Sequence, residues 1–302
     1  MAKRTVKVFQ IDVFTQALFA GNPAGVVLGA EALTEAEMQS LARELNNSDS
    51  AFVLPADAAD HDLHLRFFTP TREVAFVGHA SVAAHVARLA AGLGKAGRLR
   101  QKSRSGVYDV EIAGTAAVPL VTVAIPVPSF NPPIDAGTRS RLLDILGIDT
   151  AALDPKCPLV VTKRTSTRLM IGLRSAAVLA GIQPDFDGLK RLTPHIGADG
   201  YFVFVRDAHG PGTTESRLFS PVLGIPEDPV SGNAHGMLGA YLVANNLLPL
   251  KDGRGRFRGY QGRAMARPGE VEVEVQTEDG RPVRILMSGT ARVVFTTDVT
   301  LD

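Results

Sequence analysis

Three acidic residues of this chain lie beside segments that read as helix ends, and they could move protons. They are Asp49, Glu73 and Asp228. A carboxylate near a buried, partly apolar helix start can have a shifted pKa and can act as a general acid or base. Each residue also has a plainer interpretation, since Asp228 can cap a helix or turn and Asp49 can be a polar loop residue. The fold must therefore bring these carboxylates to a binding site before they count as catalytic.

Two similar tripeptides open the two most apolar helices predicted for the chain. They are Gly78-His79-Ala80 and Gly232-Asn233-Ala234, and Ser231 precedes the second one. A helix N-terminus has unpaired backbone N–H groups and about half a positive charge, so it can bind a carboxylate or phosphate without a Lys or Arg. Glycine lets the ligand approach the backbone closely. Two such starts facing one crevice would hold a small acid; the alternative is that both glycines simply make turns before core helices.

The elements that must position these residues are a few helices among many strands. Thr34 and Glu37 form a capping-box pattern, which predicts a helix that ends near Asn46. Segments 80–93 and 233–248 are apolar on nearly all sides, as is typical of buried helices, and each is too short to span a bilayer. Strands are predicted at 6–14, 24–28, 51–54, 63–68, 107–113, 118–125, 158–162, 168–173, 201–205, 271–276 and 283–288. Sheet wrapped around a central helix would bury both apolar segments.

An ordered set of internal similarities indicates a duplication. Residues 47–53 align with 197–203, 68–70 with 219–221, and 78–80 with 232–234, at offsets of 150, 151 and 154 residues. The sequence therefore predicts two domains of one design, residues 1–125 with 288–302 and residues 126–287. The Pro-rich stretch 126–133 is expected to be the linker, and a strand over 290–297 is expected to return to the first domain. The crevice between the halves is the expected place for a site.

Composition excludes several classes of function. The 302 residues include 32 basic and 31 acidic side chains, and a net charge of +1 gives no general attraction to nucleic acid or an anionic membrane. Arg254, Arg256 and Arg258 alternate as one solvated face of a strand does. The single cysteine, Cys157, excludes an intrachain disulfide and a catalytic thiol pair. No metal-ligand spacing, membrane helix or secretory leader is recognised, so we expect a cytoplasmic protein.

Motifs along essentially the whole chain resemble one known family. They are Ile11 to Thr15 with Phe19 to Ala24, Met38-Gln39 to Ser48-Asp49, Phe68-Thr69-Pro70 to Gly78-His79-Ala80, Phe219-Ser220-Pro221 to Asn233-Ala234, Gln261 to Gly269, and Ser288 to Ala291. Together they resemble the PhzF-like (phenazine-biosynthesis) isomerases, within the diaminopimelate-epimerase-like fold. This resemblance implies an α+β fold of two pseudo-symmetric lobes. Each lobe would be a curled, mostly antiparallel sheet around a central buried helix, with the active site in the interlobe cleft.

The resemblance also implies an activity and its residues. The expected reaction is a cofactor-independent isomerisation that moves a proton on a small carboxylate-bearing substrate, as in trans-2,3-dihydro-3-hydroxyanthranilate isomerase. By resemblance, Asp49 is the acid/base, and His79 and Asp228 complete the catalytic set. The residues expected to bind the substrate are Gly78, Ala80, Ser231, Gly232, Asn233 and Glu73. Neither a cofactor nor a metal is expected, nucleic acid and membrane partners are not expected, and a homodimer is.

Two positions depart from the family pattern. Asp49 stands where the family has Glu, so the carboxylate reaches roughly 1.5 Å less far, and a misplacement of ~1 Å can lower a rate on the order of 10²-fold. Asn233 stands where the phenazine enzymes have Ser, and its amide both donates and accepts. Two other hypotheses therefore stay open: an amino-acid racemase or epimerase that uses two carboxylates, and a non-catalytic protein that binds a small acid with a decayed base.

Overall fold

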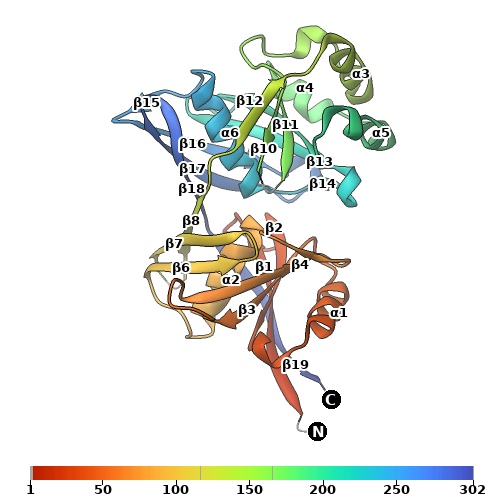
Figure 1. Ribbon diagram of the computed structural model, residues 1–302. Coiled ribbons are helices and arrows are strands. Elements are labelled where there is room, and N and C mark those ends of the chain that lie inside the picture. The colour runs from red at the N-terminus through yellow and green to blue at the C-terminus, as the bar shows by residue number, and fades with distance from the viewer. Residues whose placement is uncertain (1–2, 116, 165, 302) are drawn as a thin grey trace. The chain divides into compact units, whose positions relative to one another are not determined.

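The computed structural model, which describes residues 3–115, 117–164 and 166–301, divides into two units (Figure 1). The first unit runs to Ala124 and resumes at Ser288, and the second runs from Ile125 to Met287. The chain thus leaves the first unit, builds the second, and returns to the first.

The first unit has eight strands before the chain leaves it, and a long one after it returns. Its elements are β1 Arg4–Val13, β2 Asn22–Leu28, η1 Ala30–Ala32, α1 Glu35–Leu45, β3 Ser50–Pro55, β4 Leu63–Phe68, β5 Glu73–Val74, α2 Gly78–Ala90, β6 Gly97–Ser103, β7 Gly106–Gly114, β8 Pro119–Ile125 and β19 Ala291–Leu301. The capping box predicted for α1 is confirmed, because Thr34 Oγ1 accepts from the Glu37 N–H at 3.3 Å and Glu37 Oε2 accepts from the Thr34 N–H at 2.7 Å.

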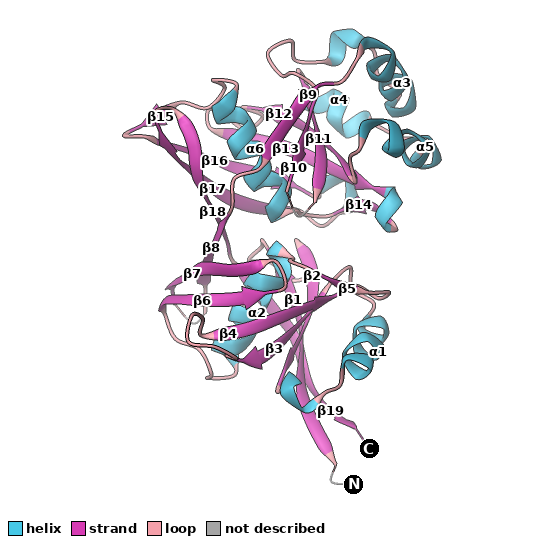
Figure 2. Ribbon diagram, viewed as in Figure 1, coloured by secondary structure: helices cyan, strands magenta, loops and turns pink. Residues whose placement is uncertain are grey.

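The second unit has more helix than the first. Its elements are β9 Ser129–Pro133, α3 Ala136–Leu146, η2 Thr150–Ala152, β10 Val160–Lys163, β11 Thr167–Leu173, α4 Ala176–Gly181, α5 Phe186–Ile196, β12 Gly200–Arg206, β13 Thr213–Ser220, η3 Pro221–Leu223, β14 Ile225–Asp228, α6 Gly232–Ala244, β15 Leu250–Lys251, β16 Arg254–Gln261, η4 Arg263–Met265, β17 Gly269–Glu278 and β18 Arg281–Gly289. Figure 2 shows α3, α4 and α5 gathered together at one side of this unit.

The strands of both units pair in the same succession. In the first unit β1–β2, β3–β4, β4–β5 and β6–β7 are antiparallel, whereas β2–β3 and β4–β6 are parallel. In the second unit β10–β11, β12–β13, β13–β14 and β16–β17 are antiparallel, whereas β11–β12 and β13–β16 are parallel. The matching topology supports a duplication.

The strand register corrects the sequence alignment of the repeats by one residue. Ser50 lies opposite Phe68 in the first unit, and Tyr201 lies opposite Phe219 in the second. The offset in these strands is therefore 151 residues rather than the 150 that aligned Asp49 with Asp199. The pairing with the neighbouring strand, which a short motif match does not include, determines the true alignment.

The two apolar helices are buried as predicted. Ten residues of α2 and eleven of α6 are buried. Helix α2 packs against β1, β2, β3 and β19, and α6 packs against β16 and β17. Within the described part of the chain, no helix has the length and hydropathy needed to cross a bilayer.

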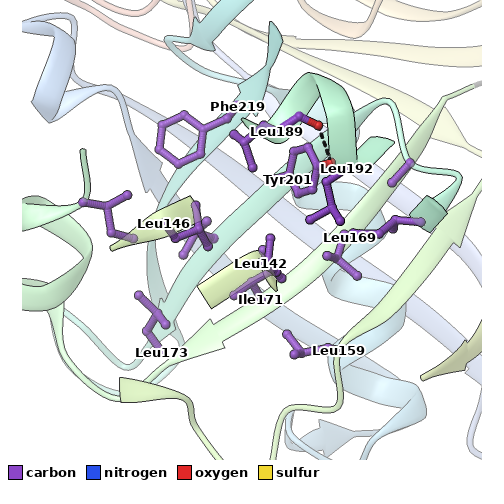
Figure 3. Packing of buried hydrophobic residues seen from close by; sticks show 14 of the residues in the cluster. Leu142, Leu146, Leu159, Leu169, Ile171, Leu173, Leu189, Leu192, Tyr201 and Phe219 are labelled. Carbon is purple, nitrogen blue, oxygen red and sulfur yellow. Dashed lines mark hydrogen bonds between the residues drawn. The ribbon is translucent and has the colours of Figure 1, made fainter. Parts of the chain in front are cut away.

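A second layer of core lies between helices α3 to α5 and the sheet of the second unit (Figure 3). Leu142 and Leu146 of α3 and Leu189 and Leu192 of α5 meet apolar residues of β11 to β13 there. Tyr201 is fully buried in this layer, and its hydroxyl donates to the Leu189 carbonyl at 2.9 Å. That bond satisfies the one polar atom of the tyrosine side chain, so the layer excludes water without leaving this group unpaired.

Two predictions about the chain path had different outcomes. Strand β19 pairs antiparallel with β1 from Ala291 opposite Val13 to Leu301 opposite Arg4, so the predicted return to the first unit is confirmed. The Pro-rich linker prediction is wrong for residues 129–133, which form β9 and pair with β10. All five β9 residues are exposed, and proline is tolerated in an exposed strand at positions where no ladder N–H is needed.

The alternating arginines of β16 lie on a solvated strand face, as predicted. Arg256 Nε donates to Glu274 Oε2 at 2.7 Å, and Arg258 Nη2 donates to Glu272 Oε1 at 2.8 Å. These cross-strand pairs neutralise the charges of Arg256 and Arg258.

Between the buried helix and a neighbouring strand, the long side chain comes from the strand in the first unit and from the helix in the second. In the first unit Gln101 of β6 reaches the helix, and its Nε2 donates to Ser81 Oγ at 3.0 Å. In the second unit His235 of α6 reaches the strand, and a Cβ added at Gly259 would overlap the imidazole ring. The registers of β4–β6 and β13–β16 align Gln101 with Gly259. At this pair of positions the first unit therefore combines a helix serine with a strand glutamine, and the second combines a helix histidine with a strand glycine.

We expect Gly259→Gln to lower the free energy of unfolding by about 1–3 kcal/mol, because the new side chain would occupy the volume of the His235 ring. Urea unfolding measures the change. His235→Ser in the same chain should recover part of the loss by copying the Ser81–Gln101 arrangement. If the double variant loses as much free energy of unfolding as the two single variants together, the two positions do not compensate each other and the prediction is wrong.

Candidate functional site

Asp49 and His79 lie together at the start of α2. Asp49 Oδ2 lies 3.8 Å from His79 Nε2, and the two side chains are 14% and 8% exposed. Burial lowers the pKa of His79 to about 4, so the ring is neutral at pH 7. The structure thus brings together two of the three predicted catalytic residues.

Asn22 determines which nitrogen of His79 has the proton. The Asn22 Nδ2 group lies 3.5 Å from His79 Nδ1, and an amide nitrogen can only donate. Nδ1 is therefore the acceptor, and Nε2 has the hydrogen that points toward the Asp49 side. No hydrogen-bond partner for this buried Nε2 is found among the described residues. A neutral N–H donor is left available for a ligand.

Asn22 is itself held by a rigid turn. Gly21 has φ +62°, and a Cβ there would collide with the Val13 carbonyl, so only glycine fits this position. The Phe19 N–H donates to Asp12 Oδ2 at 2.6 Å, which anchors the turn from inside. The support that Asn22 gives His79 joins residues 57 positions apart, so no short sequence motif indicates it.

The N-terminus of α2 has no side-chain cap. Val77 occupies the N-cap position and makes no capping hydrogen bond through its side chain. Gly78, His79 and Ala80 form the first turn and are all buried. The predicted binding residues Gly78 and Ala80 therefore lie with His79 at a helix start whose N–H groups no cap residue occupies.

Glu73 has a different environment from the one expected of a substrate ligand. Its two carboxylate oxygens accept from Arg66 Nε and Nη2, each at 2.8 Å. Hydrogen bonding to Arg66 holds the pKa of Glu73 below its usual value. The side chain is 16% exposed, so most of its bonding capacity is already used.

The start of α6 is capped, unlike that of α2. Ser231 Oγ accepts from the Ala234 N–H at 3.3 Å, and the Ser231 N–H donates to Gln261 Oε1 at 3.2 Å. Gln261 Nε2 also donates to the Asp228 carbonyl at 2.6 Å. The buried Gln261 therefore fixes the segment that contains Asp228 and Ser231, a role that sequence reasoning missed.

His235 supports this segment from inside the second unit. Burial lowers its pKa to about 4, so the ring is neutral at pH 7. Nδ1 lies 2.8 Å from the Ser231 carbonyl, which can only accept, so Nδ1 has the proton. Nε2 lies 3.2 Å from Ser216 Oγ, whose single hydroxyl hydrogen is shared between this nitrogen and the Tyr260 carbonyl at 3.1 Å. The partners of the ring all lie within the second unit, and we interpret His235 as a structural residue.

Asp228 and Asn233 are both partly exposed, and a buried cation lies near Asp228. Burial lowers the pKa of Arg168, and the negative charges of Asp228 and Asp199 counteract that shift. Arg168 lies opposite Gly200 in the sheet, and a Cβ at Gly200 would press on the Arg168 side chain. The glycine therefore leaves room for the arginine, whose place near Asp228 no short sequence motif indicates.

The described residues contain no group of three His, Cys, Asp or Glu side chains arranged to hold a metal ion. Cys157 is buried, and burial raises the pKa of its thiol to about 11, so it is protonated at pH 7. At the start of α2, the titratable pair is a carboxylate, Asp49, and a neutral histidine, His79.

The whole chain is similar to known proteins. A family model described as phenazine biosynthesis-like protein matches residues 11–297. The uncharacterized isomerase YddE of Escherichia coli K12 is 39% identical over 290 residues, which cover 96% of each chain.

Solved structures extend these similarities to the fold. A PhzF-family phenazine biosynthesis protein of Bacillus anthracis matches with a TM-score of 0.86 and 25% identity, over 99% of this chain and 100% of that one. A probable proline racemase of Agrobacterium radiobacter shares the mixed α+β fold, with a TM-score of 0.64 and 18% identity over 98% and 93% of the two chains. The resemblance inferred from the sequence motifs is confirmed, and the chain belongs to the phenazine biosynthesis-like (PhzC-PhzF) family of isomerases.

Proposed function

We propose that the protein is a cofactor-independent isomerase that moves a proton on a small carboxylate-bearing substrate. The observation that carries the proposal is the pairing of Asp49 with a neutral, buried His79 at the uncapped start of α2. The helix start offers backbone N–H groups to the substrate carboxylate, as at other helix N-termini. Asp49 is the acid/base, and His79 Nε2 donates a hydrogen bond.

In this proposal the second unit supplies a fixed set of groups. Asp228, Gly232 and Asn233 contact the substrate, and Gln261 and Ser231 keep that segment in place. That both sets of residues serve one substrate stays a prediction. If both sets of residues serve one substrate, Asn233→Ala and Asp49→Asn should each lower the turnover of the same compound.

The inequality of the two units favours an isomerase over a racemase with two equivalent carboxylates. His79 can exchange a proton, whereas the amide of Asn233 at the corresponding helix start cannot. The strand register also matches Asp49 with Gly200 rather than with Asp199. In this proposal the first unit supplies the Asp49–His79 pair, and Asp228 completes the catalytic set from the second unit.

Proton NMR of trans-2,3-dihydro-3-hydroxyanthranilate in deuterated buffer tests the proposal. We expect loss of the C3 proton signal and formation of product with the wild-type protein, and neither with Asp49→Asn. If deuterium instead enters the α-carbon of an amino acid and the chirality is lost, the protein is a racemase and the isomerase proposal is wrong. Tight binding of small carboxylates without any hydrogen exchange would replace it by a binding protein.

The homodimer implied by the family resemblance is also proposed. Light scattering on the purified protein measures its mass directly. A mass near 64 kDa, about twice the chain mass of 32.1 kDa, is expected, and a monomer would contradict the proposal.

A further inference from the structure

The segment that leads into α2 is bound to the sheet by a bidentate ion pair. Arg66 of β4 uses Nε and Nη2 to bind both oxygens of Glu73, at 2.8 Å each. The Arg66 guanidinium also lies over the Phe68 ring, 5.1 Å from its centroid. We name Arg66, Glu73 and Phe68 the first clamp.

The second unit contains the same arrangement before α6. Arg217 of β13 binds both oxygens of Glu227 through Nε and Nη2, again at 2.8 Å each. Its guanidinium lies 4.9 Å from the Phe219 ring centroid. Arg217, Glu227 and Phe219 are the second clamp. The counterpart of Glu73 is thus Glu227 and not the predicted site residue Asp228.

We propose that the two clamps are positioning devices that hold the starts of the buried helices, the first for His79 and the second for Asn233. This assigns Glu73 to positioning rather than to substrate binding. The inference rests on the proposed function for the importance of His79 and Asn233, although the geometry of the clamps does not depend on it.

The absence of a side-chain cap on α2 explains why a positioning device is needed. A helix start without a capping side chain gets its position from the residues before it. Those residues are fixed in succession: Glu73 by Arg66, the Ala75 carbonyl by Ser105 Oγ at 3.2 Å, and the Phe76 ring by stacking on Tyr108 at 4.5 Å. The chain therefore arrives at His79 from a segment with little freedom.

The burial of the pairs makes them rigid. The side chains of Arg66 and Glu73 are 20% and 16% exposed, and those of Arg217 and Glu227 are 11% and 12% exposed. A bidentate arginine–carboxylate pair fixes direction as well as distance. A displacement of ~1 Å at a reacting group can lower a rate on the order of 10²-fold, so rigidity here matters for turnover.

The test removes each pair and observes the helix start directly. Taking away one partner would leave a buried unpaired charge and could unfold the protein, so Arg66→Met/Glu73→Met removes both charges and keeps apolar volume. We expect the ¹⁵N and ¹H signals of the His79 ring to shift in the double variant while the protein stays folded. Unchanged His79 signals in the folded double variant would overturn the proposal.

A matched control shares the same arginine. Arg66 Nη2 also donates to Glu35 Oε2 of α1 at 2.7 Å, and Glu35 is 70% exposed. Glu35→Gln should leave the His79 signals in place, whereas the folded Glu73→Gln variant, which keeps one oxygen that accepts from Arg66, should move them. Equal shifts in both variants would show a general effect of Arg66 and would also overturn the proposal.

The second clamp is tested with Arg217→Met/Glu227→Met and the side-chain amide signals of Asn233. These measurements need no substrate, so they separate the two proposals. If the His79 and Asn233 signals shift but no carboxylate is turned over, the clamp proposal stands and the isomerase proposal is wrong. Turnover that depends on Asp49, with signals unchanged in the folded double variants, would retain the isomerase and reject the clamps. Where turnover is found, the double variants should lower kcat on the order of 10²-fold with KM nearly unchanged.

Discussion

Replacing Asp49 by Asn should lower the rate of hydrogen exchange into the substrate by about 10²–10⁴-fold, the usual contribution of a positioned acid/base. The amide has nearly the shape of the carboxylate but cannot accept a proton at pH 7. His79 and the start of α2 remain, so binding of the carboxylate should change much less than turnover. Single-turnover kinetics with NMR detection separate the two quantities.

Asp49→Glu is the matched comparison. It restores the carboxylate and adds one methylene, which lengthens the side chain by about 1.5 Å. In the wild-type protein the Asp49 carboxylate lies 3.8 Å from His79 Nε2. We expect this variant to exchange hydrogen well above the level of Asp49→Asn. Full activity of Asp49→Asn would mean that another group is the base, and Asp228 would be the next residue to change.

Acid should destabilise the fold well above the pH at which ordinary carboxylates titrate. Burial lowers the pKa values of His79, His85 and His235 from 6.5 to about 4. Below pH 6.5 the unfolded chain binds protons that the folded chain does not, so stability falls with pH. The stability is fully present above pH 6.5 and is lost progressively as the pH falls toward 4.

The loss is on the order of 2 kcal/mol per histidine by pH 5, which is large against a typical total of 5–15 kcal/mol. Urea unfolding at pH 7.5, 6 and 5 measures it. His235→Gln should reduce the loss by about a third, since it removes one of three such groups. His195→Gln is the matched control, because it removes a histidine at an exposed position of α5 and leaves the three buried rings in place. A free energy of unfolding that stays constant from pH 7.5 to 5 would show that the buried rings do not stay neutral.

Local signals predicted the elements whose formation depends on nearby residues. The capping box located the start of α1, and the all-round apolar pattern identified α2 and α6 as buried. Helix α3 was missed although Asp135 caps it and Gly147 ends it with a positive φ, because its large apolar residues all lie in its C-terminal half, between Leu142 and Leu146. Strand β9 was missed because its prolines are typical of linkers and its exposed residues show no apolar alternation.

The site was predictable only in part, for a physical reason. Asp49 and His79 stand in recognisable motifs, and the structure places them 3.8 Å apart. The roles of Gln261 and Arg168 depend on which strands pair and in which register, and no short sequence pattern contains that information. Glu73 shows the reverse case, since its proximity to a helix start suggested substrate binding, whereas Arg66, seven residues earlier, is its partner.

The pairing of β1 with β19 has a consequence for the order in which the protein is made. Arg4 pairs with Leu301, so β1 leaves the ribosome long before its partner strand β19 has been synthesised. The second unit, from Ile125 to Met287, is continuous and can complete its own sheet during translation. N-terminal domains generally fold first during synthesis, but here the first unit is completed only after the second has been made. In the nascent chain, the Asp49–His79 pair therefore forms in a unit that lacks one of its own strands until β19 has been synthesised.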